Sequence, residues 1–311
     1  MEIIMDRTCF VDGVDIFRRY GAKVKRNGYN DLLTFPPLIP PDSTSWPEED
    51  GVEVDLMDPK LDTKEVSISF VADDANGLVN FLCQPGYHTW SVGFGREWRL
   101  RVSTQSNNQL IDITSIFTLK FIDDFPSRAE NYISGSGCGV IIPKCDYEMD
   151  GLSWRDYGII VKKGTRDEVL KSSAVKQNLS QKIQTKDGQF YDVEQVVFEA
   201  KDVTFNLYMC ADSIDRFWQC YDAFFNDLIK PEERILYVGY TDEEYPCYYK
   251  KSSNFKVLTL SDKVMVEFSL TLVFTSFRVN ETEYILASED DERIVDEEDG
   301  ETCIDLGVDY D

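Results

Sequence analysis

Residues 11–25 read VDGVDIFRRYGAKVK, and residues 149–163 read MDGLSWRDYGIIVKK, so the chain carries nearly the same phrase twice. Each copy has an Asp-Gly pair followed a few residues later by a Tyr-Gly pair. The phrase alone is weak evidence, because such pairs are common at turns. An internal duplication requires that the surrounding segments also recur with the same spacing.

Further landmarks keep nearly that spacing. The Asp-Gly pairs begin at Asp12 and Asp150, an offset of 138, and the Tyr-Gly pairs begin at Tyr20 and Tyr157, an offset of 137. Residues 64–70 (KEVSISF) match residues 201–207 (KDVTFNL), again at 137, and residues 116–122 (IFTLKFI) match residues 265–271 (MVEFSLT) near 149. We call the offset of 137 the repeat offset. Landmarks in the same order predict two equivalent halves.

Each half mixes strand patterns with one helical pattern. Val66, Ile68 and Phe70 alternate with serines, and Phe117 begins a similar alternation, which is typical of strands in a sheet with one covered face. Residues 212–228 instead place apolar residues at helical spacing, with Asp212 as the expected N-cap. Residues 74–83 form a shorter counterpart. We therefore expect a mainly β (α+β) fold with two tandem β-sandwich or barrel domains, each with one flanking helix.

Length and composition are compatible with two domains. The 311 residues, 42% of them hydrophobic, suffice for two separate cores. We predict a first domain at 1–132, a glycine-containing linker at 133–143, a second domain at 144–280 and an acidic tail at 281–311 that is expected to be mobile. Neither a signal-peptide pattern nor a long apolar run is present, so we expect no secretion signal and no membrane insertion.

The net charge of -25 is concentrated at the C-terminal end. Residues 281–311 hold fourteen Asp or Glu against one Arg, a contribution of -13, which leaves -12 for residues 1–280. A solubilising extension is favoured over a specific docking peptide. Because the remainder is still acidic, the composition argues against a DNA-binding surface, which would need clustered Lys and Arg.

Each half also contains a long excursion of about forty residues before its main strand, well beyond ordinary connection lengths. Residues 32–55 (LLTFPPLIPPDSTSWPEEDGVEVD) carry five prolines, and residues 170–193 (LKSSAVKQNLSQKIQTKDGQFYDV) suggest a long hairpin around Asp187-Gly188. Exposed apolar groups among prolines are typical of a docking arm. We expect residues 34–50 to contact a neighbouring subunit, with the interface candidates Phe35, Leu38, Ile39 and Trp46.

Catalytic and metal-binding patterns are missing. The single histidine, His88, lies in a turn-like context without a nucleophile motif. The glycine-rich stretches 93–95 and 135–139 do not form a phosphate-binding motif. Eight scattered cysteines lack metal or disulfide spacing and are expected to be buried free thiols. We expect no enzymatic activity, no cofactor and no metal.

The repeated pattern resembles tailed-phage distal tail proteins and, more broadly, the tail-tube fold. The residues that carry the resemblance are Asp12, Gly13, Tyr20, Gly21 and Val24 in the first half and Asp150, Gly151, Tyr157, Gly158 and Val161 in the second. The resemblance implies a structural protein of the virion tail, assembled in the bacterial host, that forms a ring and anchors the host-recognition apparatus. The duplication departs from a typical distal tail protein and is similar to hub proteins with tandem tube domains.

Two function classes stay open at this stage. The first is a phage or prophage tail component that binds copies of itself, as a trimer with pseudo-sixfold symmetry or as a hexamer, and other tail proteins, while DNA passes through without binding. The second is a glycan-binding β-sandwich module, suggested by the aromatic residues Trp46, Trp90 and Trp98.

Overall fold

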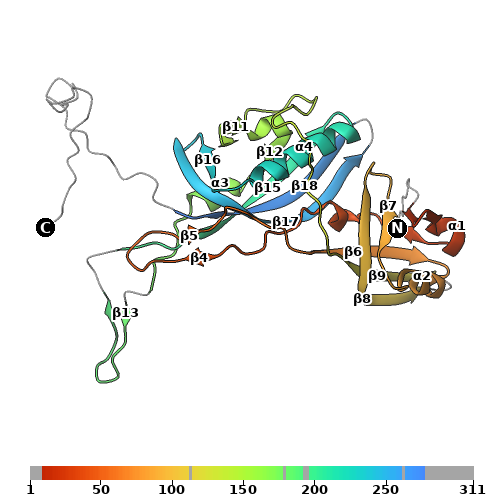
Figure 1. The fold of residues 1–311 in the computed structure, drawn as a ribbon, viewed down its shortest axis with the longest axis horizontal. Coiled ribbons are helices and arrows are strands. Elements are labelled where there is room, and N and C mark those ends of the chain that lie inside the picture. The colour runs from red at the N-terminus through yellow and green to blue at the C-terminus, as the bar shows by residue number, and fades with distance from the viewer. Residues whose placement is uncertain (1–8, 112–113, 178–179, 192–195, 261–262, 277–311) are drawn as a thin grey trace. The chain divides into compact units, whose positions relative to one another are not determined.

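The computed structural model describes residues 9–111, 114–177, 180–191, 196–260 and 263–276. These residues form two seven-stranded antiparallel sheets with a few helices, and two short two-stranded ribbons (Figure 1). The predicted class, mainly β with some α, is confirmed. The described residues belong to one compact unit. The predicted acidic tail lies outside the described residues, and the boundaries at 132 and 143 stay predictions.

The first sheet is built from residues 10–123. Its strands are β1 (Phe10–Val11), β2 (Val14–Asp15), β3 (Lys23–Val24), β6 (Lys64–Ala72), β7 (His88–Ser91), β8 (Glu97–Ile111) and β9 (Thr114–Asp123). Three helices accompany it: α1 (Ile16–Tyr20), the 3-10 helix η1 (Asn30–Leu33) and α2 (Ala75–Leu82).

The second sheet is built from residues 147–274. Its strands are β10 (Tyr147–Met149), β11 (Leu152–Ser153), β12 (Ile159–Val161), β15 (Lys201–Ala211), β16 (Arg234–Val238), β17 (Glu243–Leu260) and β18 (Val264–Phe274). Its helices are the 3-10 helix η2 (Trp154–Tyr157), α3 (Thr165–Leu170) and α4 (Ile214–Leu228).

The two sheets have the same strand order. It is β2-β1-β7-β8-β9-β6-β3 in the first and β11-β10-β16-β17-β18-β15-β12 in the second, which is the same sequence of elements when each half is numbered from its own start. The strands that contain Val66 and Val203, β6 and β15, both lie next to the edge strand. The duplication inferred from four short phrases therefore extends to the whole sheet.

The repeated phrase forms the same local structure in both halves. Asp12 and Gly13, at φ 50° and 75°, make the tight turn between β1 and β2, and the second Asp-Gly pair has φ 50° and 77° between β10 and β11. Positive φ at both central positions is the turn that suits a two-residue hairpin. Gly21 and Gly158 then end α1 and η2 in the left-handed conformation. The phrase therefore encodes a hairpin, a short helix and its C-cap.

The strand pairing corrects one spacing predicted from the sequence, the offset near 149 between residues 116–122 and residues 265–271. Val66 pairs with Phe121 in the first sheet, and Val203 pairs with Leu272 in the second. Phe121 of β9 therefore corresponds to Leu272 of β18, at an offset of 151 and not 149. A shift of two residues keeps every side chain on the same face. The alternation of apolar residues therefore cannot distinguish an offset of 149 from one of 151.

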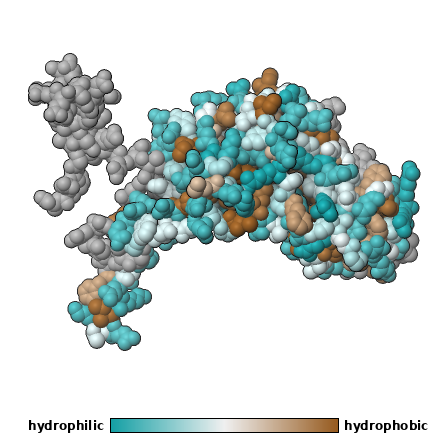
Figure 2. All heavy atoms as spheres, in the orientation of Figure 1, coloured by the Kyte–Doolittle hydropathy of each residue, from teal (hydrophilic) through white to brown (hydrophobic). Residues whose placement is uncertain are grey.

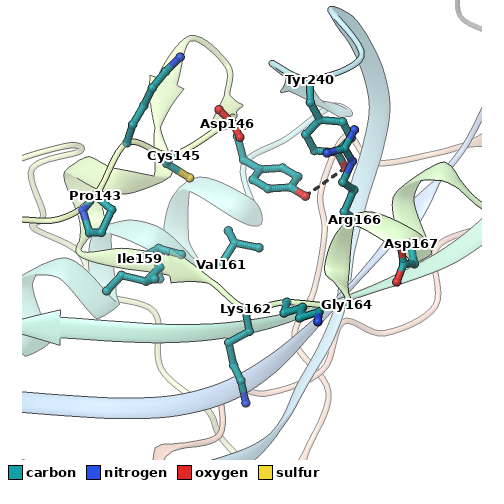
Figure 3. Close-up of a pocket in the computed structure, with 14 residues that line it drawn as sticks. Pro143, Cys145, Asp146, Ile159, Val161, Lys162, Gly164, Arg166, Asp167 and Tyr240 are labelled. Carbon is teal, nitrogen blue, oxygen red and sulfur yellow. Dashed lines mark hydrogen bonds between the residues drawn. The ribbon is translucent and has the colours of Figure 1, made fainter.

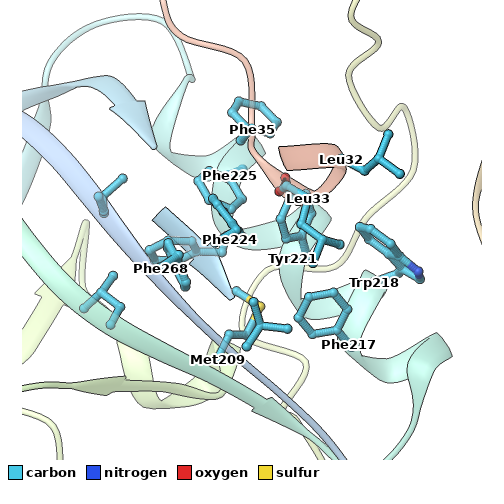
Figure 4. Packing of buried hydrophobic residues seen from close by; sticks show 14 of the residues in the cluster. Leu32, Leu33, Phe35, Met209, Phe217, Trp218, Tyr221, Phe224, Phe225 and Phe268 are labelled. Atoms are coloured by element: carbon cyan, nitrogen blue, oxygen red, sulfur yellow. Dashed lines mark hydrogen bonds between the residues drawn. The ribbon is translucent and has the colours of Figure 1, made fainter. Parts of the chain in front are cut away.

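The core follows the predicted alternation. Val66, Ile68 and Phe70 are fully buried, as are their counterparts in the second half, and α4 lies over the second sheet with an aromatic stripe inward (Figure 4). The N-cap of α4 is Ser213, whose side chain accepts a hydrogen bond from the N–H of Arg216, and not the expected Asp212. Asp212 instead accepts a hydrogen bond from the Ser213 hydroxyl.

The two long excursions are the same ribbon. Isolated bridges join Leu38 to Leu61 and Val175 to Phe198, and the second pair follows the first at the repeat offset. The short strands β4 (Ser43–Thr44) and β5 (Glu53–Val54) likewise precede β13 (Ser180–Gln181) and β14 (Phe190–Tyr191) by the repeat offset. We call residues 34–62 the first arm and residues 171–199 the second arm. Each arm follows a short helix and precedes the main strand of its half, β6 or β15.

Candidate assembly surfaces

The base of the first arm packs on the second half of the same chain. Phe35 stacks on Phe225 of α4, with ring centroids 4.6 Å apart and planes 9° apart, and is buried (Figure 4). The hydroxyl of Tyr249 donates to the carbonyl oxygens of Phe35 and Pro36, at 3.2 and 3.0 Å, and the hydroxyl of Tyr221 donates to that of Leu33, just before the arm, at 2.6 Å. The first arm is therefore part of the core that joins the two halves.

The tip of the first arm contacts the base of the second arm. The buried ammonium of Lys176 donates to the carbonyl oxygens of Trp46 and Glu49, each at 2.7 Å. The N–H of Phe198 donates to Asp50 at 2.6 Å, and its carbonyl oxygen accepts from the N–H of Gly51 at 2.8 Å. Main-chain groups of one arm thus pair with groups of the next, which fixes the position of the tip.

Gly51 is required at this contact. Its φ is +72°, and a Cβ added there would lie 1.7 Å from the carbonyl oxygen of Thr275. The neighbouring N–H of Val52 donates to the same oxygen at 2.9 Å. A side chain is therefore excluded both by the backbone conformation and by the close approach of the second half.

A charged and aromatic cluster makes a second junction between the halves. The guanidinium of Arg96 lies 3.9 Å from the ring of Trp218 and forms an ion pair with Asp222 at 2.6 Å. The indole N–H of Trp218 donates to the carbonyl oxygen of Phe94. Since both α4 residues face the loop between β7 and β8, this cluster and the first arm hold the halves together at two places.

Equivalent lysines hold both arms at their roots. The ammonium of Lys64 donates to the carbonyl oxygen of Leu32 at 2.7 Å, and that of Lys201 donates to Val169 at 2.6 Å. Burial lowers the pKa of each lysine from 10.5 to about 8. Each lysine therefore supplies a donor to the last carbonyls of the short helix that precedes the arm.

The repeated aspartates clamp the hairpin to the neighbouring strand in the same way. Asp12 accepts from the N–H of Thr89 at 2.8 Å and lies 2.6 Å from Nδ1 of His88, while Asp150 accepts from the N–H of Ile235 at 2.9 Å and forms an ion pair with Arg234. Burial works to raise the pKa of Asp12, but the hydrogen bonds from the histidine and the backbone outweigh it and lower the pKa.

This placement identifies His88 as a structural residue. It occupies the position of Arg234 in the other half, and its Nε2 is buried without a hydrogen-bond partner among the described residues. A general base must reach the proton that it removes from a substrate. The paired Asp and His therefore fix strand geometry, and the structure adds no argument for catalysis.

An open sheet edge lies in the second half at β12. The bonds from Lys162 to Asn206 and from Cys210 to Gly158 flank the strand, so the main-chain groups of Ile159 and Val161 face away from β15. A cavity of about 480 Å³ borders this edge, with Arg166 placed 4.6 Å from the ring of Tyr240 (Figure 3). Strand β3 ends the first sheet at the equivalent position. Unpaired strand edges are able to accept a further strand.

The four predicted interface residues divide into two groups. Phe35 and Leu38 are buried within this chain, whereas Ile39 and Trp46 are 46% and 49% exposed. Only the last two remain candidates for a subunit contact. The arm itself meets the other half of its own chain, because the tandem arrangement places an equivalent domain within reach.

The aromatic residues that suggested glycan binding are mostly unavailable. Trp90 is fully buried and Trp98 is 8% exposed, so neither offers a face for a sugar, and Trp46 alone is half-exposed. The indole N–H of Trp46 donates to Glu53 across the ribbon. The expectation of an exposed aromatic platform was wrong, because these tryptophans alternate inward with the strand.

The prediction that the cysteines are buried free thiols is confirmed only in part. The seven cysteines of the described residues are free; four are buried, Cys145 and Cys210 are half-buried, and Cys83 is exposed. Burial raises the pKa of Cys9 and of Cys220 to about 12. Such thiols are poor nucleophiles at neutral pH.

The described part of the chain was compared with the requirements of a metal centre and of a membrane-spanning helix. No three His, Cys, Asp or Glu side chains there form a group that could hold a metal ion. No helix there is sufficiently long and apolar to cross a bilayer.

Sequence reasoning missed the arm contacts. The signal was present, since Asp50-Gly51 and Asp187-Gly188 are a second pair of Asp-Gly phrases, separated by the repeat offset. Both glycines have positive φ, +72° and +86°. The prolines of the first arm and the polar residues of the second hid the correspondence, because only the backbone conformation is shared.

The fold and its contacts define a tandem duplicated β protein whose arms carry its most specific interactions. No protein-family model matches the chain, and no curated protein matches it in sequence. One solved structure that it resembles is that of the SPP1 Dit (gp 19.1) protein, described as a paradigm of the hub adsorption apparatus in Gram-positive infecting phages. The match covers 86% of this chain and 98% of that chain, with 9% identity and a TM-score of 0.30, which is too low to establish a shared fold.

Proposed function

We propose that the chain is a structural component of a phage or prophage tail tip, a distal tail or hub protein. In this role it forms a ring that extends the tail tube and anchors the host-recognition apparatus. The observation that carries the proposal is the head-to-tail contact between two equivalent halves, in which the arm of one half docks on the base of the next arm. The resemblance of the repeated Asp-Gly and Tyr-Gly phrase to tail-tube domains supports the same assignment.

Repetition of such a contact produces a closed or helical assembly. A head-to-tail interface that repeats by rotation forms a ring when the rotation closes. Three chains supply six equivalent halves and a pseudo-sixfold ring, and six chains supply a true hexamer. Residues 1–280 carry a net charge of -12. An acidic bore repels phosphate and lets DNA pass without binding.

The proposal is tested by native mass spectrometry at several protein concentrations, with negative-stain microscopy of the same samples. We expect a trimer or hexamer with an annular outline, and no shift of duplex DNA in a gel titration at moderate salt. A monomer that persists when other tail proteins are added, or tight DNA binding, would contradict the proposal.

A further inference from the structure

The first arm docks within the chain, but the equivalent tip of the second arm and the equivalent base of the first arm do not contact each other within the chain. The tip of the first arm, residues 46–53, docks on the base of the second arm. By the repeat offset, the tip of the second arm is residues 183–190, and the base of the first arm contains Ile39 and Leu61. One chain has only two halves, so the second tip has no equivalent base ahead of it within the chain.

The base of the first arm presents the same main-chain groups as the base of the second. The N–H of Ile39 donates to Lys60, and that of Asp62 donates to Pro37, both at 2.8 Å. The same two bonds recur at the second base, shifted by the repeat offset. In this register the N–H and carbonyl of Leu61 point outward, as those of Phe198 do where they meet Asp50 and Gly51.

The second tip has the complementary groups. Asp187 and Gly188 take the places of Asp50 and Gly51, and Gly188 has the same left-handed conformation, with φ +86°. A Cβ added to Gly188 would meet no atom within 4 Å. The glycine is therefore not explained by close packing within its own chain, whereas Gly51 is.

The two bases differ in one side chain, Lys176 on the second and Ile39 on the first, and each suits the tip that it faces. At the docked contact, Lys176 supplies a donor to the carbonyl oxygen of Trp46. In the second tip, the equivalent carbonyl of Ile183 accepts from the N–H of Lys186 within its own turn, at 3.2 Å. No lysine is needed on the receiving base, and that position is occupied by the exposed Ile39.

Apolar surface is exposed on both sides of this pairing. Ile183 and Phe190 are 40% and 51% exposed on the second arm, and Ile39 is 46% exposed on the first. Hydrophobic atoms lie open on the β13–β14 hairpin in Figure 2. Exposed apolar groups on a ribbon with a matching receptor mark an interaction surface.

We propose that the β13–β14 hairpin of one copy docks on the base of the first arm of a second copy of this chain. Asp187 accepts from the main-chain N–H of Leu61, Gly188 donates to the carbonyl of Leu61, and Ile183 and Phe190 cover Ile39. The contact is head to tail, and it repeats between chains what the first arm does within one chain. This inference rests on the proposed ring and specifies its chain-to-chain contact.

The test mixes two singly substituted proteins in a background with Cys83→Ser and Cys303→Ser. One carries Ile39→Cys and the other Ile183→Cys, and a short bismaleimide joins cysteines that lie close together. We expect a cross-linked species of twice the chain mass in the mixture and at most a tenth of that yield with either protein alone. The doubled mass shows that the product is intermolecular, and the mixing requirement shows that it joins position 39 of one copy to position 183 of another.

Gly188→Ala provides the matched perturbation. By equivalence with Thr275, the carbonyl of Asp124 in the second copy would meet the new Cβ, so the cross-link yield should fall at least tenfold. Gly137→Ala is the control, because Gly137 has φ +81° and also has open space around its Cβ position. Circular dichroism verifies that both variants fold, and the control should cross-link at the parent yield.

The outcomes separate the two proposals. An oligomer in native mass spectrometry without the mixed cross-link would overturn the hairpin contact and leave the tail-tip proposal intact. A normal cross-link yield with Gly188→Ala would also overturn the hairpin contact. Monomers at every concentration of the isolated protein would overturn the hairpin contact, and monomers that persist when other tail proteins are added would overturn the tail-tip proposal as well.

Discussion

Phe35 provides the sharpest test of how the first arm joins the two halves. Its ring is 5% exposed, stacks on Phe225 and makes edge contacts with Tyr221 and Tyr249 at centroid distances of 6.3 and 5.7 Å. These partners belong to the second half, while Phe35 belongs to the first. Truncation to alanine therefore removes contacts between the halves and leaves each sheet unchanged.

The size of the effect follows from burial and ring packing. Burying a phenylalanine side chain contributes about 2 kcal/mol, and one well-placed aromatic pair adds about 1 kcal/mol. The unfilled cavity adds a further cost, so we expect Phe35→Ala to lower the free energy of unfolding by about 4 kcal/mol. Urea denaturation followed by tryptophan fluorescence measures this loss, because Trp218 lies at the junction between the halves.

Trp46→Ala is the matched control. Trp46 lies on the same arm but is half-exposed, so its truncation should cost less than about 1 kcal/mol. A double-mutant cycle between Phe35 and Phe225 should give a coupling of about 1 kcal/mol. Equal losses from Phe35→Ala and Trp46→Ala, or a loss below about 1.5 kcal/mol for Phe35→Ala, would refute the claim that the arm base is core.

Three further predictions concern single contacts. Between pH 8 and 10.5 the unfolded chain binds more protons at Lys64 than the folded chain, so raising the pH stabilises the folded state. The difference in unfolding free energy between the wild type and Lys64→Met should therefore rise by about 2 kcal/mol from pH 7 to 9.5. Urea titration at each pH measures it. Gly51→Ala should lower the melting temperature more than Gly86→Ala, because only the former meets a carbonyl oxygen, at 1.7 Å; equal shifts would contradict the docked arm. Asp150→Ala should lower the free energy of unfolding, measured by urea denaturation, by about 2 kcal/mol. Asp150→Asn should lower it by less than half of that, because asparagine keeps a hydrogen-bond acceptor and tolerates φ 50°. Equal losses would contradict the role of Asp150 in clamping the hairpin.

The sheet itself could be predicted because its signals are local. Alternating burial of Val66, Ile68 and Phe70 is encoded in consecutive residues, and the Asp-Gly turn and Tyr-Gly cap depend on backbone conformations that few other residues adopt. Repetition of these signals then gave the equivalence of the two halves. The predicted correspondence between β9 of the first half and β18 of the second was wrong by two residues, because a two-residue shift leaves the same faces buried.

The candidate site could be predicted only in part, because its contacts are long-range. Composition marks Phe35 and Trp46 equally as apolar residues among prolines, yet Phe35 is core and Trp46 is half-exposed. The difference depends on the ring of Phe225, which lies far downstream in the other half of the chain. Trp90 and Trp98 likewise suggested an exposed platform until strand alternation placed them inside.

Tandem duplication accounts for the different chemistry of the docked first arm and of the proposed contact between chains. The first arm docks on a base that is covalently linked to it, so its effective concentration is high and association costs little translational freedom. Such a contact tolerates the desolvation of Lys176, which is 3% exposed, in exchange for a fixed geometry with Trp46 and Glu49. A contact between separate chains must overcome the full cost of association. Replacement of that lysine by Ile39, opposite an apolar tip, removes the desolvation cost and adds buried apolar area, so the two arms diverge in the direction that their different tasks require.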